Sequence, residues 1–207
     1  SLSSAYYNLR VNFQKTSTLD SSILYYRLAL KNTKKSKEIS KIKDNLGVLY
    51  KGLGKYDSAI IFHNKAIDLR VLTGDKKGTA YSLNNIGNVY MKQYDYAKAL
   101  DYYNKSLKIR RELKDTDDIS SSLNNIGNLY IQLNKYNEAL EYLNQALQLR
   151  QTSKDKKMTA YSLNAIGNFY LQMKIYDKAQ EYYMQSLSIR QELGDKNDIA
   201  GSLNNMG

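Results

Sequence analysis

The sequence predicts an all-α solenoid built from stacked helix–turn–helix pairs. The first observation is a period of 40 residues, at which glycine recurs as Gly47, Gly87, Gly127, Gly167 and Gly207. The second is that each period holds two segments whose apolar residues recur at helical spacing. The third is the absence of proline from all 207 residues, which suits a chain made almost entirely of helices.

The first helix of each pair is clearest in the period that follows residue 75. One face of this helix carries apolar or small residues, namely Leu83, Ile86, Gly87 and Tyr90. Asp75 precedes the pattern and is a suitable N-cap, because its carboxylate can accept a hydrogen bond from the first turn.

The pattern restarts near the letters KQYD and predicts the second helix. Its apolar stripe comprises Tyr96, Ala99, Leu100, Tyr103, Ser106 and Leu107, and the opposite side carries Asp101, Asn104, Lys105 and Lys108. Gly87 and Ala99 are small, which allows the two helices to approach closely. Arg110 falls near the C-terminus of the helix, where a cation suits the helix dipole.

Five repeats and the start of a sixth therefore form one predicted array over residues 1–207. Their approximate bounds are 2–36, 39–76, 79–116, 119–156, 159–196 and 199–207. The first repeat matches the others least well, as terminal repeats of solenoids usually do. Because the chain stops inside a repeat, we expect it to be part of a longer protein.

These positions resemble the tetratricopeptide repeat, whose pattern is matched by Leu83, Ile86, Gly87, Tyr90, Ala99, Tyr103 and Ser106. The resemblance covers essentially the whole chain. It implies a right-handed superhelix that binds proteins or peptides, as part of a larger sensor, regulator or assembly protein. The usual closing proline is missing, and the period is longer than the usual length of about 34 residues. Kinesin light chains and bacterial sensor or regulator proteins contain similar longer variants.

Asparagines recur on the side of the first helix that lies opposite its apolar face, although asparagine is a mediocre helix former. The resemblance places this side in the concave groove of the superhelix. A carboxamide both donates and accepts hydrogen bonds, so it can bind the main chain of an extended peptide. The predicted peptide-binding residues are Tyr81, Asn84, Asn85, Asn88, Lys92, Asn124, Asn125, Asn128, Tyr161, Asn164 and Asn168.

Two alternatives to peptide binding stay open. The asparagines could solvate the face or tie adjacent repeats together, and the array would then be a structural or self-associating scaffold, with homo-oligomers formed through its open ends. The second repeat departs from the pattern with Asp44, Asn45 and Val48, so its surface chemistry should differ.

The net charge of +11 is unevenly distributed along the chain. Residues 1–78 carry a net charge of +9 and residues 79–207 a net charge of +2. This asymmetry predicts an acidic partner near the first two repeats. The alternative is that the lysines between Lys31 and Lys43 form a solvated connector. Nucleic acid is disfavoured as a partner, because many of the 20 tyrosines recur on apolar faces.

No catalytic constellation is evident, so we expect a protein that is not an enzyme and needs no cofactor. The single histidine, His63, occupies the position of Tyr103 and Leu143 and is predicted to be a core residue. There is no metal-ligand spacing and no phosphate-binding loop. No apolar run reaches the roughly 18 residues that span a membrane. The compartment is undecided; the cytoplasm is favoured, and the periplasm is the alternative for a bacterial sensor.

Overall fold

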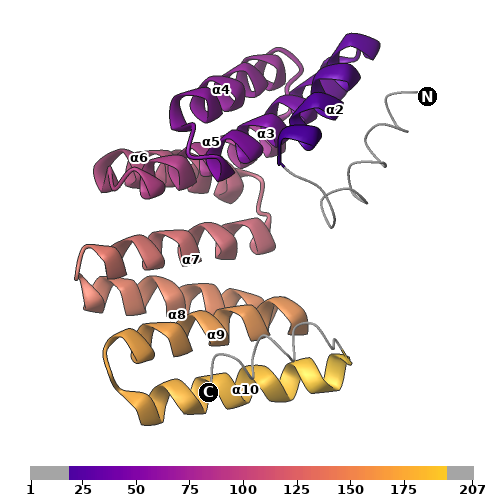
Figure 1. Ribbon diagram of the computed structural model, residues 1–207. Helices are drawn as coiled ribbons and strands as arrows, with labels where there is room; N and C mark the ends of the chain where they lie inside the picture. The colour runs from indigo at the N-terminus through magenta and orange to yellow at the C-terminus, as the bar shows by residue number, and fades with distance from the viewer. Residues whose placement is uncertain (1–18, 195–207) are drawn as a thin grey trace. The chain divides into compact units, whose positions relative to one another are not determined.

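A computed structural model of the chain describes residues 19–194, and every regular element within this range is an α-helix (Figure 1). The predicted all-α class is thereby confirmed. The helices are α2 (Leu19–Asn32), α3 (Ser36–Gly52), α4 (Tyr56–Leu72), α5 (Lys76–Lys92), α6 (Tyr96–Glu112), α7 (Thr116–Gln132), α8 (Tyr136–Thr152), α9 (Lys156–Gln172) and α10 (Tyr176–Leu193).

Consecutive helices pack as pairs, and α9 with α10 shows the antiparallel arrangement clearly (Figure 1). The chain divides into two compact units, residues 1–109 and residues 110–207. The first unit contains α2 to α5 and most of α6, and the second contains the end of α6 and α7 to α10. Much of the first predicted repeat and the start of the sixth lie outside the described residues, and the single continuous array stays a prediction.

An aspartate side chain caps three of the first helices. Asp75 accepts a hydrogen bond from the backbone N–H of Gly78, and Asp115 and Asp155 do the same for Asp118 and Met158. The predicted cap at Asp75 is confirmed. The helices start at residues 76, 116 and 156, three residues before the predicted repeat bounds, because the capped turn precedes the apolar pattern.

The turns between helices pass through the left-handed backbone region. Gly74 and Gly194 have φ angles of +69° and +68°. At equivalent turns Lys114 and Lys154 adopt φ angles of 54° and 59°, although they carry a Cβ atom. Such a residue pays a conformational cost that glycine avoids, so these two turns are held by the packing of the helices on either side.

The recurring glycines lie where the two helices of a pair cross. A Cβ atom on Gly87 would lie 2.5 Å from a ring carbon of Tyr103, and one on Gly127 would lie 2.9 Å from Cγ of Leu143. Ala99 is fully buried on the facing helix. The predicted close approach is therefore confirmed: a large side chain from the second helix fills the space that glycine leaves open.

Stacked aromatic rings join the two helices of each pair. The ring centroids lie 5.4 Å apart for Tyr90 and Tyr102, and 5.5 Å apart for Tyr170 and Tyr182. The ammonium group of Lys98 lies 5.3 Å from the centroid of Tyr90. These half-buried rings show how a chain with 20 tyrosines uses them for packing at the edge of the core.

Alkaline pH should destabilise the fold through its buried tyrosines. Burial raises the pKa of the Tyr103 and Tyr183 hydroxyls above the ordinary value of 10.0. The folded state thus keeps its protons where the unfolded chain releases them. The resulting stability is complete below pH 10.0 and is lost as the pH rises through the folded-state pKa.

We therefore expect the urea midpoint to fall when the pH is raised above 10.0, and to fall less for Tyr103→Phe than for the unsubstituted chain. Urea titrations at neutral and alkaline pH measure both quantities. An equal alkaline loss in the two proteins would contradict the contribution assigned to Tyr103.

Candidate functional site

The side of the first helices that carries the recurring asparagines is called the asparagine face below. On α5 it comprises Tyr81, Asn84, Asn85, Asn88 and Lys92, which share one side of the helix by their spacing. Tyr81 is 45% exposed and Lys92 is exposed, whereas Asn84 and Asn85 are only 9% and 7% exposed. In the first unit, Tyr81, Asn88 and Lys92 are therefore more accessible to a ligand than Asn84 or Asn85.

Asn84 and Asn85 are buried although they lie opposite the apolar face of α5. Helices α3 and α4 of the preceding repeat pack against α5. The amide nitrogen of Asn85 is buried and has no hydrogen-bond partner in the structure. The sequence prediction treated all three carboxamides as equally available, and the packing of neighbouring repeats makes them different.

The second unit presents the same face on α7 and α9. Asn128 and Asn168 are exposed, whereas Asn124, Asn125 and Asn164 are half-buried. On α9, Tyr161 is 39% exposed, and the guanidinium of Arg190 lies 5.1 Å from its ring centroid.

One asparagine of the second unit contacts the next repeat. The amide nitrogen of Asn124 lies 3.5 Å from the hydroxyl of Ser162, so a long hydrogen bond links α7 to α9. This contact is the kind that the alternative interpretation expected, in which asparagines tie repeats together.

Two carboxamides, of the half-buried Asn88 and the exposed Asn168, are anchored by tyrosines from the second helix of their own pair. The Tyr103 hydroxyl donates to Oδ1 of Asn88 at 2.8 Å, and the Tyr183 hydroxyl donates to Oδ1 of Asn168 at 2.7 Å. The asparagines lie opposite the apolar face of the first helix by their spacing, yet the second helix contacts them. A tyrosine hydroxyl at the end of a long side chain reaches around the helix, whereas a helical wheel records only the direction of the Cα–Cβ bond.

The anchor leaves one chemical function of the carboxamide available. The hydrogen bond occupies Oδ1, while Nδ2 of Asn88 and of Asn168 makes no hydrogen bond within the described residues. A tyrosine hydroxyl is protonated at neutral pH and donates there, and burial raises the pKa of both hydroxyls, so the donors persist to more alkaline pH. Each carboxamide is thus held in one orientation with its N–H donors unused.

The middle repeat provides a natural contrast. Leu143 stands where the neighbouring repeats have Tyr103 and Tyr183, so no hydroxyl can reach Asn128 from that position. Asn128 is exposed and makes no side-chain hydrogen bond within the described residues.

Buried arginines join consecutive repeats, a feature that the sequence analysis missed. Arg150 is 2% exposed and donates to the hydroxyl of Ser162 at 2.6 Å, to that of Ser120 at 2.9 Å and to the Met158 carbonyl at 3.1 Å. It therefore bonds with both α7 and α9. Burial lowers its pKa, but an arginine still remains charged.

Within the described residues, Arg110 bonds only to α7 of the following repeat, while its Nε atom is buried without a partner, and these contacts correct the helix-dipole explanation of that residue. Its guanidinium is 4% exposed and donates to the Ser122 hydroxyl and the Asp118 carbonyl, both at 2.8 Å. A sequence signal was present: serine follows twelve residues after arginine four times in succession along the chain, as in Arg110 and Ser122.

In the second repeat the buried network includes a carboxylate and the histidine. Asp44 accepts hydrogen bonds from Ser82 at 2.8 Å and from Arg70, and its Oδ1 lies 2.8 Å from Nδ1 of His63. His63 is fully buried, which confirms its predicted place in the core. Serine, histidine and aspartate meet here, but Ser82 bonds to Asp44 rather than to the ring that would have to activate it.

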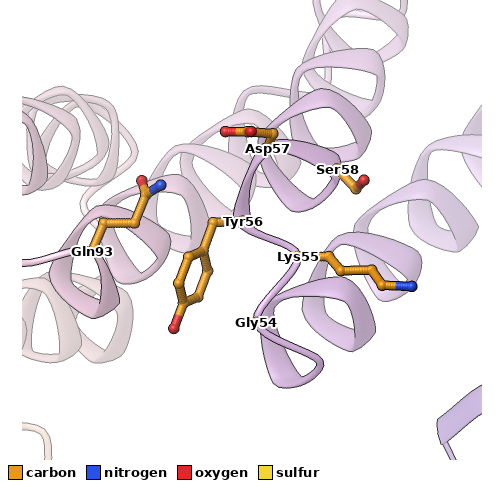
Figure 2. A pocket seen from close by; sticks show the side chains of 6 residues that line it. All are labelled: Gly54, Lys55, Tyr56, Asp57, Ser58 and Gln93. Carbon is orange, nitrogen blue, oxygen red and sulfur yellow. The ribbon is translucent and has the colours of Figure 1, made fainter.

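A hollow of about 330 Å³ lies in the first unit between the turn from α3 to α4 and the end of α5. Its lining comprises Gly54, Lys55, Tyr56, Asp57, Ser58 and Gln93. Figure 2 shows Tyr56 projecting between the turn and Gln93, while the Lys55 side chain points away from Gln93. Among the described residues, no group of three His, Cys, Asp or Glu side chains could hold a metal ion.

The paired helices, the glycine crossings and the small residues opposite them define a helical-repeat protein of the class that binds other proteins. The tetratricopeptide repeat pattern is matched over residues 78–152, and again over residues 40–70 and 160–193. The chain belongs to the tetratricopeptide repeat family, as the resemblance predicted.

Solved structures share the fold at low sequence identity. A Rap protein complexed with competence and sporulation factor is 19% identical, with a TM-score of 0.78 over 92% of this chain and 54% of that one. A putative kinesin light chain from Podosopora anserina is 14% identical, with a TM-score of 0.70 over 92% of this chain and 95% of that one. A signal transduction ATPase with a tetratricopeptide-repeat sensor, from Pyrococcus horikoshii, is 17% identical, with a TM-score of 0.77 over 98% of this chain and 31% of that one.

No curated protein matches the sequence. In the part of the chain that the structure describes, no helix has the length and apolar character needed to cross a membrane.

Proposed function

We propose that this protein is a peptide-binding module that holds an extended segment of a partner protein against its asparagine face. The observation that carries the proposal is made in each unit separately: an anchored carboxamide, Asn88 on α5 in the first unit and Asn168 on α9 in the second. Membership of a family of protein-interaction scaffolds supports the proposal. The similar Rap structure contains a bound factor, which supports ligand binding by this fold.

The chemistry favours recognition of the main chain. A carboxamide whose oxygen is already bonded offers its N–H groups to acceptors, and the carbonyl oxygens of an extended segment are acceptors in any sequence. The tyrosine anchor removes part of the conformational entropy that binding would otherwise cost. Tyr81 and Tyr161 are exposed beside the carboxamides and are suited to contact ligand side chains. We further propose that the module serves a larger sensor or regulator protein.

The proposal predicts that Asn88→Ala weakens binding of a peptide selected from a display library against the unsubstituted chain. Loss of one hydrogen-bonding partner should cost about 1–3 kcal/mol, or roughly fivefold to 150-fold in Kd. Because the Tyr103 hydroxyl loses its acceptor, stability should fall slightly rather than rise. Isothermal titration and thermal melts measure the two effects.

Tyr103→Phe tests the anchor itself, because it removes the hydroxyl and keeps the ring over Gly87. We expect weaker peptide binding in the unsubstituted background and no further loss in the Asn88→Ala background. Lys108→Ala, at an exposed position on α6, is the matched control and should leave affinity unchanged. Unchanged affinity in Asn88→Ala, Asn168→Ala and their combination would contradict peptide binding at this face.

The structural or self-associating scaffold remains the second candidate. The hydrogen bond from Asn124 to Ser162 favours it, because this contact stabilises neighbouring repeats without a ligand. Under this interpretation Asn124→Ala lowers the melting temperature of the ligand-free protein, and the measured molecular mass rises with protein concentration.

A further inference from the structure

Two lysines of α3 occupy positions that are apolar in every later repeat. Lys43 corresponds to Leu83, Leu123 and Leu163, and Lys51 corresponds to Met91, Ile131 and Leu171. Both lysines are half-buried. The second repeat thus places positive charge where its neighbours place hydrocarbon, although the helices there are otherwise packed alike.

Each of these lysines lies near enough to another lysine for the two charges to repel each other. Lys51 lies in the last turn of α3 and Lys92 in the last turn of α5, and these two helices are in contact. Burial and then the charge of Lys92 lower the pKa of Lys51, and burial and then the charge of Lys65 lower that of Lys43. Among the described residues, no carboxylate forms an ion pair with any of the four.

This arrangement works against folding. The pKa of Lys51 in the folded state lies below its ordinary value of 10.5. At neutral pH, where the lysine is charged in both states, its charge therefore destabilises the folded state. The helix dipole explains one cation at each helix end, but it does not explain Lys43 in the middle of α3. A bound anion would relieve the repulsion within both lysine pairs.

We propose that Lys51 and Lys92, together with Lys43 and Lys65, form a basic site on the first unit that binds an acidic segment of a partner protein. The site deepens the proposed function and rests on it in part. A protein segment fits better than nucleic acid, because the nearby rings are already engaged: Tyr50 and Phe62 stack with centroids 5.2 Å apart, Tyr50 is buried, and the Lys65 ammonium lies 5.8 Å from the Phe62 centroid. Carboxylates supply the negative charge that neutralises the lysines, and their binding does not need aromatic rings for stacking.

The test uses the full chain and a fluorescein-labelled oligoglutamate peptide, with binding followed by fluorescence anisotropy. Lys51→Met introduces the residue that the third repeat has at this position, and Lys92→Gln removes the charge that repels it. We expect Kd to rise roughly fivefold for each substitution, the upper range for partly exposed ion pairs, and the salt dependence of binding to flatten. Lys51→Met should also raise the Tm, because it removes a half-buried, repelled charge.

The matched control is Lys108→Met, which replaces an exposed lysine on α6 and should change neither Kd nor Tm. Asn88→Ala separates this site from the main-chain site: oligoglutamate binding that survives Asn88→Ala but not Lys51→Met supports the basic site by itself. Unchanged oligoglutamate affinity in Lys51→Met overturns the proposal. A lower Tm in Lys51→Met assigns that lysine to the helix end and overturns it as well. So does tighter binding of a single-stranded oligothymidylate than of oligoglutamate, since the surface would then recognise nucleic acid.

Discussion

Replacing Arg150 by alanine should lower the free energy of unfolding by about 3–5 kcal/mol. The side chain is 2% exposed and bonds with the helices on either side of its own. Its loss leaves a cavity and removes the donors that satisfy the Ser120 hydroxyl, the Ser162 hydroxyl and the Met158 carbonyl. Urea titration followed by circular dichroism measures the change.

An exposed arginine provides a matched control for the buried Arg150. Arg111 is exposed near the end of α6, and Arg111→Ala should change stability by less than about 0.5 kcal/mol. Arg150→Lys should not restore stability, because one ammonium group cannot reproduce donors placed on Nε and on Nη1. If Arg150→Ala and Arg111→Ala unfold at the same urea concentration, the arginine does not hold the repeats together.

Gly127→Leu should destabilise the second unit by about 3 kcal/mol or more through overpacking. A Cβ atom alone would lie 2.9 Å from Cγ of Leu143 and 3.2 Å from the Ala139 carbonyl oxygen, and backbone cannot move aside as a side chain can. Gln148→Leu, at an exposed position on α8, introduces the same side chain without the clash and should be nearly neutral.

A double substitution gives a more specific test of the same helix crossing. Gly127→Ala should be destabilising by itself, and it should be less so when Leu143→Ala removes the side chain that it meets. Strictly additive effects of the two substitutions would show that the two positions do not compete for the same space. An unchanged melting temperature in Gly127→Leu would refute the close crossing of α7 and α8.

Most of the fold could be predicted from the periodic pattern of apolar and small residues. A stripe such as Ala99, Tyr103 and Leu107 on α6 must be buried, and small residues such as Gly87 must lie where helices cross, whatever the ligand is. These consequences follow from the geometry of one helix pair, and one repeat of sequence is enough to derive them. The cap at Asp75 is equally local, since donor and acceptor lie three residues apart.

Features that depend on contacts with a neighbouring helix could not be predicted from the sequence pattern. Arg110 has a sufficient local explanation as a cation at a helix end, yet its partners lie in the following repeat. Asn84 is buried although it lies opposite the apolar face of its own helix. Asn88 bonds to Tyr103 because the tyrosine side chain extends beyond the face that its own Cβ atom marks. Each case needs the position of a second helix, which the pattern of one helix does not contain.

The most direct test of the central claim follows the side-chain amide groups of Asn88 and Asn168 by nuclear magnetic resonance while a library-selected peptide is added. We expect the Nδ2 signals of both residues to shift as the peptide saturates the protein, because their N–H donors bind its carbonyl groups. We also expect Tyr103→Phe to alter the Asn88 signals before any peptide is present. Saturation that leaves both Nδ2 signals in place, with shifts confined to exposed residues of the second helices such as Asn104 and Lys108, would contradict it.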